Sequence, residues 1–125
     1  MTEFANLRFG PMPRMFPLEG TVRTVELLDG LEVSWNGGGF TVPTGFAHDG
    51  PSIPNRLRGL IYYTHRLLKP SIAHDYLFVA PNHDGFTRVE ADALFLAGLE
   101  VEGVGWLRRK TMWSAVRAGG WTTWE

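Results

Sequence analysis

The sequence contains no cysteine, which excludes disulfide bonds, zinc sites with thiolate ligands and cysteine nucleophiles. It has no apolar run long enough to cross a bilayer, and its first residues include an acid, Glu3, but no base, unlike a secretion signal. Charge of one sign is not in excess either, because twelve basic side chains face thirteen acidic ones and the formal net charge is -1. We therefore expect no transmembrane segment, no signal peptide and no nucleic-acid partner.

The 125 residues leave room for one domain, and the 44% hydrophobic content is enough for one packed core. Glycines and prolines are frequent in residues 1–20, which predicts an irregular lead-in. Residues 21–43 favour a small antiparallel β meander. In this segment, β-branched and alternating apolar stretches are separated by Asp29-Gly30, a hairpin signal, and by a glycine-rich turn at 36–39.

From residue 44 the pattern changes to loop and helix. Residues 44–54 contain two glycines and two prolines and predict a loop. Pro70 suits the first turn of a helix, and Thr87 with Glu90 forms a capping box. One short helix is predicted within residues 56–68, and further helices are predicted at residues 70–79, 87–101 and 106–118. The fold class that follows is α+β, a single domain over residues 1–125 in which three or four packed helices follow the meander.

Two polar residues interrupt apolar helical segments. His74 lies among aliphatic and aromatic residues of the helix predicted at 70–79. Asp92 lies in a stripe of the next helix that also holds four apolar residues, Val89, Ala93, Leu96 and Leu99. A carboxylate in such a stripe loses its water and needs a partner.

The spacing of these two residues predicts that they meet. His74 is six residues before Ala80, and Asp92 is five after Thr87, so at ~1.5 Å per residue they lie about 9 and 7.5 Å from the connecting loop. On antiparallel neighbouring helices they would sit at nearly the same level. Asp92 would then fix the tautomer of His74, whose other ring nitrogen would accept a proton from water or bind a metal. The alternative is a structural core pair without chemistry.

A calcium site is predicted beside this pair. Asp75 points about 100° around the helix from His74 and can face the loop that holds Asp49 and Gly50. Carboxylate and carbonyl oxygens are ligands that suit calcium, and the cation would polarise a substrate carbonyl. Ser52, in the same loop, has no basic neighbour in sequence and is expected to make a loop hydrogen bond. Asp49 could instead only cap a turn.

Tryptophans and basic residues gather near the C-terminus. Trp113, Trp121 and Trp124 are candidate interface residues, and Trp106 and four basic side chains accompany them. Such a segment suits a membrane surface, with indoles at the interface and cations on headgroups, or a protein interface. The alternative is that some indoles join the core while the basic side chains are solvated.

Four segments together resemble an uncharacterised domain family that occurs mostly in the genomes of tailed phages and prophages. They are residues 45–54 (GFAHDGPSIP), 73–77 (AHDYL), 88–95 (RVEADALF) and 112–119 (MWSAVRAG). The resemblance covers roughly residues 40–119 and implies a phage origin. It implies no activity.

A second, local resemblance is to the secreted phospholipase A(2) enzymes, especially the bacterial ones. The order of Asp49-Gly50, His74-Asp75-Tyr76 and Asp92 is similar to their calcium loop, their His-Asp helix and the aspartate of their facing helix. It implies that His74 is the general base, that Asp75 and the backbone near Asp49 bind calcium, and that Asp92 orients His74. The chain departs from those enzymes in lacking their disulfides and in placing a β meander before the helices.

These observations support two hypotheses about function. The first is a phage-encoded, calcium-assisted hydrolase with a His74–Asp92 dyad, which acts on an ester or amide and on a lipid ester if the phospholipase resemblance extends to substrate. The second is a non-enzymatic virion or tail accessory protein whose partners are other phage proteins. A third and weaker idea is a zinc peptidoglycan hydrolase with His74, Asp75 and Asp92 as ligands. The protein would act in the virion or in the host cytoplasm.

Overall fold

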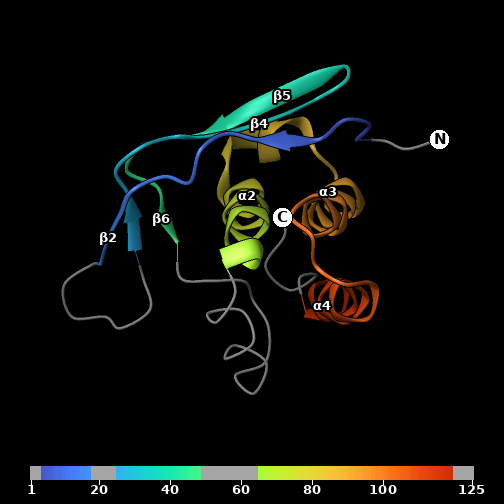
Figure 1. Ribbon diagram of the computed structural model, residues 1–125. Coiled ribbons are helices and arrows are strands. Elements are labelled where there is room, and N and C mark those ends of the chain that lie inside the picture. Colours follow the sequence, from blue (N-terminus) through green and yellow to red (C-terminus); the bar gives the residue numbers. More distant parts are fainter. Residues whose placement is uncertain (1–3, 18–24, 49–64, 120–125) are drawn as a thin grey trace.

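The computed structural model describes residues 4–17, 25–48 and 65–119, and these form two small antiparallel sheets and a group of three α-helices (Figure 1). One sheet has the strand order β1-β4-β5 and the other has the order β2-β3-β6. The strands are β1 (Arg8–Phe9), β2 (Met15–Pro17), β3 (Val25–Leu27), β4 (Leu31–Trp35), β5 (Gly38–Val42) and β6 (Ala47–His48). The α+β class is therefore confirmed.

The hairpin formed by β4 and β5 follows from its sequence. Leu31 and Val33 are buried while Glu32 between them is exposed, as an alternating strand requires. Trp35 pairs with Gly38, so the chain reverses through Asn36 and Gly37, and Gly37 has a φ of 99°. Only glycine adopts that angle without strain, which explains the turn at this point.

The predictions for the first forty residues were wrong in two respects. The expected irregular lead-in contains β1, which pairs with β4, and β2, which pairs with β3. The strand β3 does not pair with β4, so Asp29-Gly30 is not the turn of a two-residue hairpin. Instead, the Asp29 carboxylate accepts hydrogen bonds from the backbone and guanidinium of Arg14, at 2.8–3.0 Å, and the chain crosses there from one sheet to the other.

The helices follow the predicted positions closely. They are α2 (Leu68–Val79), α3 (Arg88–Val101) and α4 (Trp106–Gly119), with 3-10 turns η1 (His65–Leu67) and η2 (Pro81–Gly85). The capping box at α3 is present, because Thr87 Oγ1 accepts from the Glu90 amide and the Glu90 carboxylate accepts from the Thr87 amide. Most of the helix predicted at 56–68 lies outside the described residues.

The helices pack on one side of the β1-β4-β5 sheet. In Figure 1, β4 and β5 cover one side of the α2–α3 pair, and α4 lies against α3 on the opposite side. Gly98 allows α3 to approach β1 closely, since a Cβ there would lie 2.9 Å from the Phe9 ring. None of the described helices has the length and hydropathy needed to cross a bilayer.

Candidate functional site

The structure brings His74 and Asp92 together at the level that their spacing predicts. His74 Nε2 lies 2.5 Å from Asp92 Oδ1, and the two residues are 5% and 0% exposed. An imidazole with a proton on Nε2 satisfies this contact by donating to the carboxylate, in the neutral tautomer as in the imidazolium. In the neutral tautomer the other ring nitrogen, Nδ1, carries a lone pair and can accept a proton.

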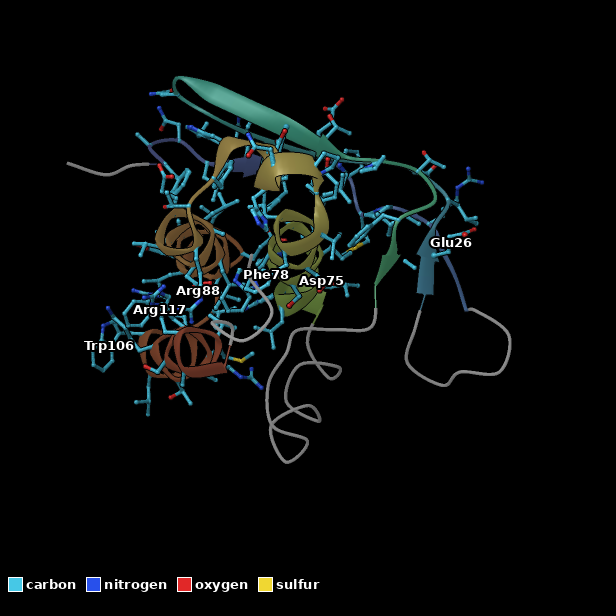
Figure 2. The ribbon with its side chains drawn as sticks, turned by 180° about the vertical axis from the view of Figure 1, so that it is seen from behind. Glu26, Asp75, Phe78, Arg88, Trp106 and Arg117 are labelled. Atoms are coloured by element: carbon cyan, nitrogen blue, oxygen red, sulfur yellow. The ribbon has the colours of Figure 1, made fainter. Side chains whose placement is uncertain are left out.

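Two arginines lie beside the second oxygen of the carboxylate, and Arg117 is hydrogen-bonded to it. Arg117 Nη1 donates to Asp92 Oδ2 at 2.8 Å, and Arg88 Nε lies 3.9 Å from the same oxygen. Arg88 also donates through Nη2 to the backbone carbonyls of Val116 and Arg117, the last turn of α4. In Figure 2, Arg88 and Arg117 lie between α3 and α4. We call His74, Asp92, Arg88 and Arg117 the buried polar cluster, and it connects α2, α3 and α4.

The charge on Asp92 is stabilised by these neighbours. Burial by itself would raise the pKa of this carboxyl, but the hydrogen bonds and charges of His74 and Arg117 outweigh it. The net result is a pKa below the ordinary value of 3.8. Asp92 is therefore ionised at neutral pH, and the guanidinium groups of Arg117 and Arg88 lie 2.8 and 3.9 Å from its Oδ2.

Aromatic rings fix the orientation of the His74 imidazole. The Phe78 and Phe95 ring centroids lie 4.8 and 5.0 Å from that of His74. Within the described part of the chain, Nδ1 of His74 has no hydrogen-bond partner. The His74 ring is therefore held in one orientation with Nδ1 unpaired among the described residues, and the residue is 5% exposed.

The predicted calcium site is only partly within the described residues. Asp75 is half-buried on α2, and Figure 2 shows it on the side of the helix turned away from β4 and β5. The other predicted ligands, Asp49 and Gly50, and the neighbouring Ser52 lie outside the described residues. Among the residues that are described, no three His, Asp or Glu side chains are grouped to hold a metal. The zinc set of His74, Asp75 and Asp92 is therefore not formed.

The tryptophans predicted as an interface differ in their positions. Trp113 is half-buried on α4, with the Lys110 ammonium 5.5 Å from its ring centroid. Trp121 and Trp124 lie outside the described residues. Trp106, at the start of α4, is 63% exposed, so it is the most accessible tryptophan in the described chain.

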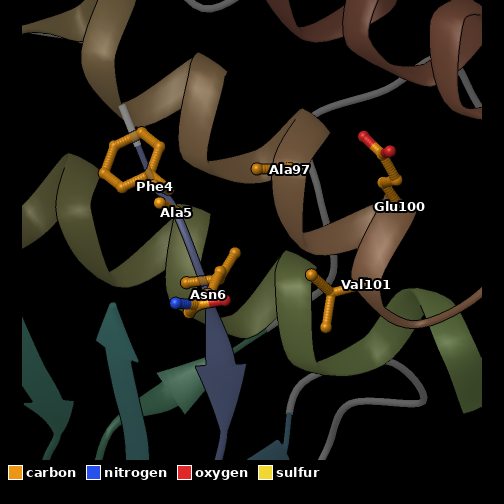
Figure 3. Close-up of a pocket in the computed structure, with 7 residues that line it drawn as sticks. Phe4, Ala5, Asn6, Ala97, Glu100 and Val101 are labelled. Atoms are coloured by element: carbon orange, nitrogen blue, oxygen red, sulfur yellow. The ribbon is translucent and has the colours of Figure 1, made fainter. Parts of the chain in front are cut away.

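A separate hollow lies on another face of α3. It encloses about 390 Å³ between the N-terminal segment at Phe4, Ala5 and Asn6 and the α3 residues Ala97, Glu100 and Val101, with Leu7 also in its wall (Figure 3). Glu100 is its one ionisable lining residue, and neither His74 nor Asp92 reaches it. The hollow is thus not a substrate cleft for the His74–Asp92 pair.

The two arginines of the buried polar cluster were not predicted. Arg88 precedes Asp92 by four residues on one helix, a spacing that places the two side chains side by side, so the sequence contained that signal. Arg117 contacts Asp92 only because α4 packs on α3, and no local pattern predicts that contact. The sequence thus predicted the His74–Asp92 contact but not the two arginines beside the Asp92 carboxylate.

No curated protein and no solved structure matches the chain. A family model described as "Protein of unknown function (DUF1353)" matches residues 26–116. That segment includes both His74 and Asp92 and extends through most of α4. Because the match covers well over half of the chain, the chain belongs to the DUF1353 family of proteins of unknown function.

Proposed function

We propose that the protein is a hydrolase in which His74 is the general base and Asp92 positions it. The observation that carries this proposal is the 2.5 Å contact from Nε2 of His74 to a fully buried carboxylate. This contact leaves Nδ1 as the nitrogen that can act on water. A buried charged pair is weak evidence for stability, because desolvating the charges offsets much of their attraction. An oriented imidazole is therefore the more informative feature of the cluster.

The chemistry of such a site needs one proton to move twice. Nδ1 of His74 accepts a proton from water as the water oxygen bonds to the carbonyl carbon of an ester or amide. The imidazolium that forms still donates from Nε2 to Asp92, whose charge stabilises it. The tetrahedral intermediate then breaks its bond to the alcohol or amine, and Nδ1 returns the proton to that leaving group. Asp92 remains ionised throughout, because Arg117 holds its other oxygen.

The proposal extends to calcium and to a lipid ester. Asp75 would be one calcium ligand, with Asp49 and the Gly50 backbone, and a bound cation would polarise the substrate carbonyl. The described residues supply only Asp75 to that set, so no step above depends on the cation. The lipid ester rests on the resemblance of the Asp49-Gly50, His74-Asp75-Tyr76 and Asp92 motifs to phospholipase A(2).

Replacing His74 with glutamine tests the chemistry. We expect the purified protein to hydrolyse glycerophospholipid vesicles or soluble nitrophenyl esters, and His74→Gln to lower kcat by about 10²–10⁴-fold, the contribution of a general base. The matched control is His83→Gln, which alters a histidine of η2 outside the cluster and should retain activity. Circular dichroism and urea unfolding would establish that each variant is folded.

Two results would contradict the proposal. The first is a folded wild-type protein that hydrolyses none of these esters with calcium present. The second is an activity that His74→Gln leaves unchanged, since the reaction would then use another base. In either case the buried polar cluster would be a structural connection between α2, α3 and α4.

Calcium binding can be tested separately from catalysis. A ligand that binds only the folded protein stabilises it by about 2.7 kcal/mol at a concentration of 100 Kd. We expect added calcium to raise the melting temperature of the wild type and Asp75→Asn to abolish that shift. Asp84→Asn, at an exposed carboxylate of η2, is the control and should retain it. An equal shift in Asp75→Asn would remove Asp75 from the ligand set.

A non-enzymatic role as a phage virion or tail accessory protein is the second candidate. The low exposure of His74 favours it, as does the way in which one polar cluster joins three helices. The resemblance of residues 45–54 and 73–77 to a phage domain family suggests the setting. Stoichiometric recovery of the protein in purified particles, together with absence of esterase activity, would support this candidate over the hydrolase.

A further inference from the structure

The first turn of α4 presents two large apolar side chains to solvent. Trp106 is 63% exposed and Leu107 is 73% exposed. Figure 2 shows Trp106 at the outer edge of α4, to the side of the helix. Met112 and Val116, later in the same helix, are buried in the cluster that also holds Phe95 and Leu99 of α3, and they hold the helix in place. The exposed pair is therefore fixed in position by the packing of the same helix.

Basic side chains follow this apolar pair directly. Arg108, Arg109 and Lys110 come next in the sequence, and α4 contains no acidic residue. Four of the twelve basic side chains of the protein lie in α4, while all thirteen acidic ones lie elsewhere. The charge of α4 is therefore opposite to that of the rest of the chain, and its partner should be anionic.

We propose that Trp106, Leu107, Arg109 and Lys110, which we call the α4 tip, bind an anionic lipid surface. At about 100° per residue, these four side chains lie within about 160° of one another around the helix, whereas Arg108 points to the opposite side. Indole and isobutyl groups would enter the boundary between headgroups and acyl chains while the cations contact lipid phosphates. Lys110 is exposed. Arg109 is half-exposed, and its Nη1 donates a hydrogen bond to the Val104 carbonyl at 3.2 Å.

Other anionic partners fit these observations less well. A nucleic acid would interact with the cations but gains little from an exposed leucine. An acidic protein would need a pocket shaped to the protruding indole and isobutyl groups, whereas the lipid boundary accepts them without one, so an acidic protein is the main rival and an outcome of the test. The inference goes beyond the proposed hydrolase, because it concerns a surface that contains no residue of the His74–Asp92 pair.

Cosedimentation with vesicles tests the proposal on the whole protein. We expect binding to vesicles of phosphatidylcholine mixed with phosphatidylglycerol, and at least tenfold weaker binding to pure phosphatidylcholine. Leu107→Asp should reduce partitioning to the anionic vesicles at least tenfold, and Lys110→Gln should reduce it about fivefold. The matched control is Val79→Asp, since Val79 is 68% exposed at the end of α2, outside the α4 tip. It should bind as the wild type does.

The proposal is overturned if the folded wild type does not bind anionic vesicles, or if Val79→Asp weakens binding as much as Leu107→Asp does. Binding of an acidic protein through the α4 tip, without any vesicle binding, would also overturn it in favour of a protein partner. His74→Gln should bind vesicles normally. A His74→Gln variant that binds vesicles but does not hydrolyse esters would show that vesicle binding is independent of the proposed catalytic pair.

Discussion

Asp92→Asn is expected to lower the free energy of unfolding by about 3–5 kcal/mol. The substitution removes the one negative charge of the buried polar cluster and leaves Arg117 and Arg88 facing a neutral amide. Removing one partner of a buried ion pair typically costs this much, because the remaining charge stays desolvated without compensation. Domains of this size are stable by only about 5–15 kcal/mol, so urea denaturation would show a large fall in the midpoint.

A second aspartate provides the matched control. Asp29 is also bound by an arginine through two side-chain hydrogen bonds, and this contact lowers the pKa of Asp29 to about 2. Both partners are exposed, however, with side-chain exposures of 76% for Arg14 and 42% for Asp29. Because solvent screens such a pair, Asp29→Asn should change the unfolding midpoint little. Equal losses in the two variants would show that burial of Asp92 does not govern its contribution.

The pH dependence of this effect has a definite sign. The pKa of Asp92 is below 3.8 in the folded protein, so folding favours its charged form. Its stabilising contribution is present above pH 3.8 and is lost as the pH falls toward the lower, folded-state pKa. The difference between wild type and Asp92→Asn should thus be constant near neutrality and shrink in acid. A difference that grows on acidification would mean that the folded protein prefers a protonated Asp92.

Features set by local sequence were predicted well. The capping box at Thr87 satisfies two amides within four residues, so it needs no tertiary information. The His74–Asp92 contact required one assumption, that α2 and α3 are antiparallel neighbours, and η2 makes this the simplest connection. In both cases the relevant groups lie a known number of residues from a recognisable turn.

Features that depend on long-range packing were missed for a physical reason. The strand β3 lies in the segment predicted to pair with residues 31–35, but it pairs instead with β2 and β6, and the chain crosses to the other sheet beside the Arg14–Asp29 contact. Val89 was placed in the apolar stripe of α3, yet it is 61% exposed, because the buried face of that helix consists instead of Ala91, Asp92, Leu94, Phe95, Gly98 and Leu99. Neither outcome follows from periodicity, which specifies a face of an element but not what covers it.

Phe95→Ala is expected to be as destabilising as Asp92→Asn, by about 3–5 kcal/mol, for a different reason. Phe95 is 1% exposed and packs in the cluster that joins α3 to α4. Truncation loses the transfer free energy of a phenyl ring and leaves a cavity that the fixed helices fill only in part. Leu107→Ala, at a 73% exposed residue of α4, is the control and should shift stability by less than about 0.5 kcal/mol.

The same variant probes the orientation of His74, because the Phe95 ring lies 5.0 Å from the imidazole. If ring packing helps to orient His74, Phe95→Ala should lower ester hydrolysis under conditions in which the variant remains folded. Phe95→Leu fills much of the cavity, so it should restore both stability and part of the activity. Nuclear magnetic resonance of the imidazole nitrogens would report the ring directly. A loss of less than about 1 kcal/mol in Phe95→Ala would show that α4 closes onto α3 without this ring and that the packing between them is adjustable.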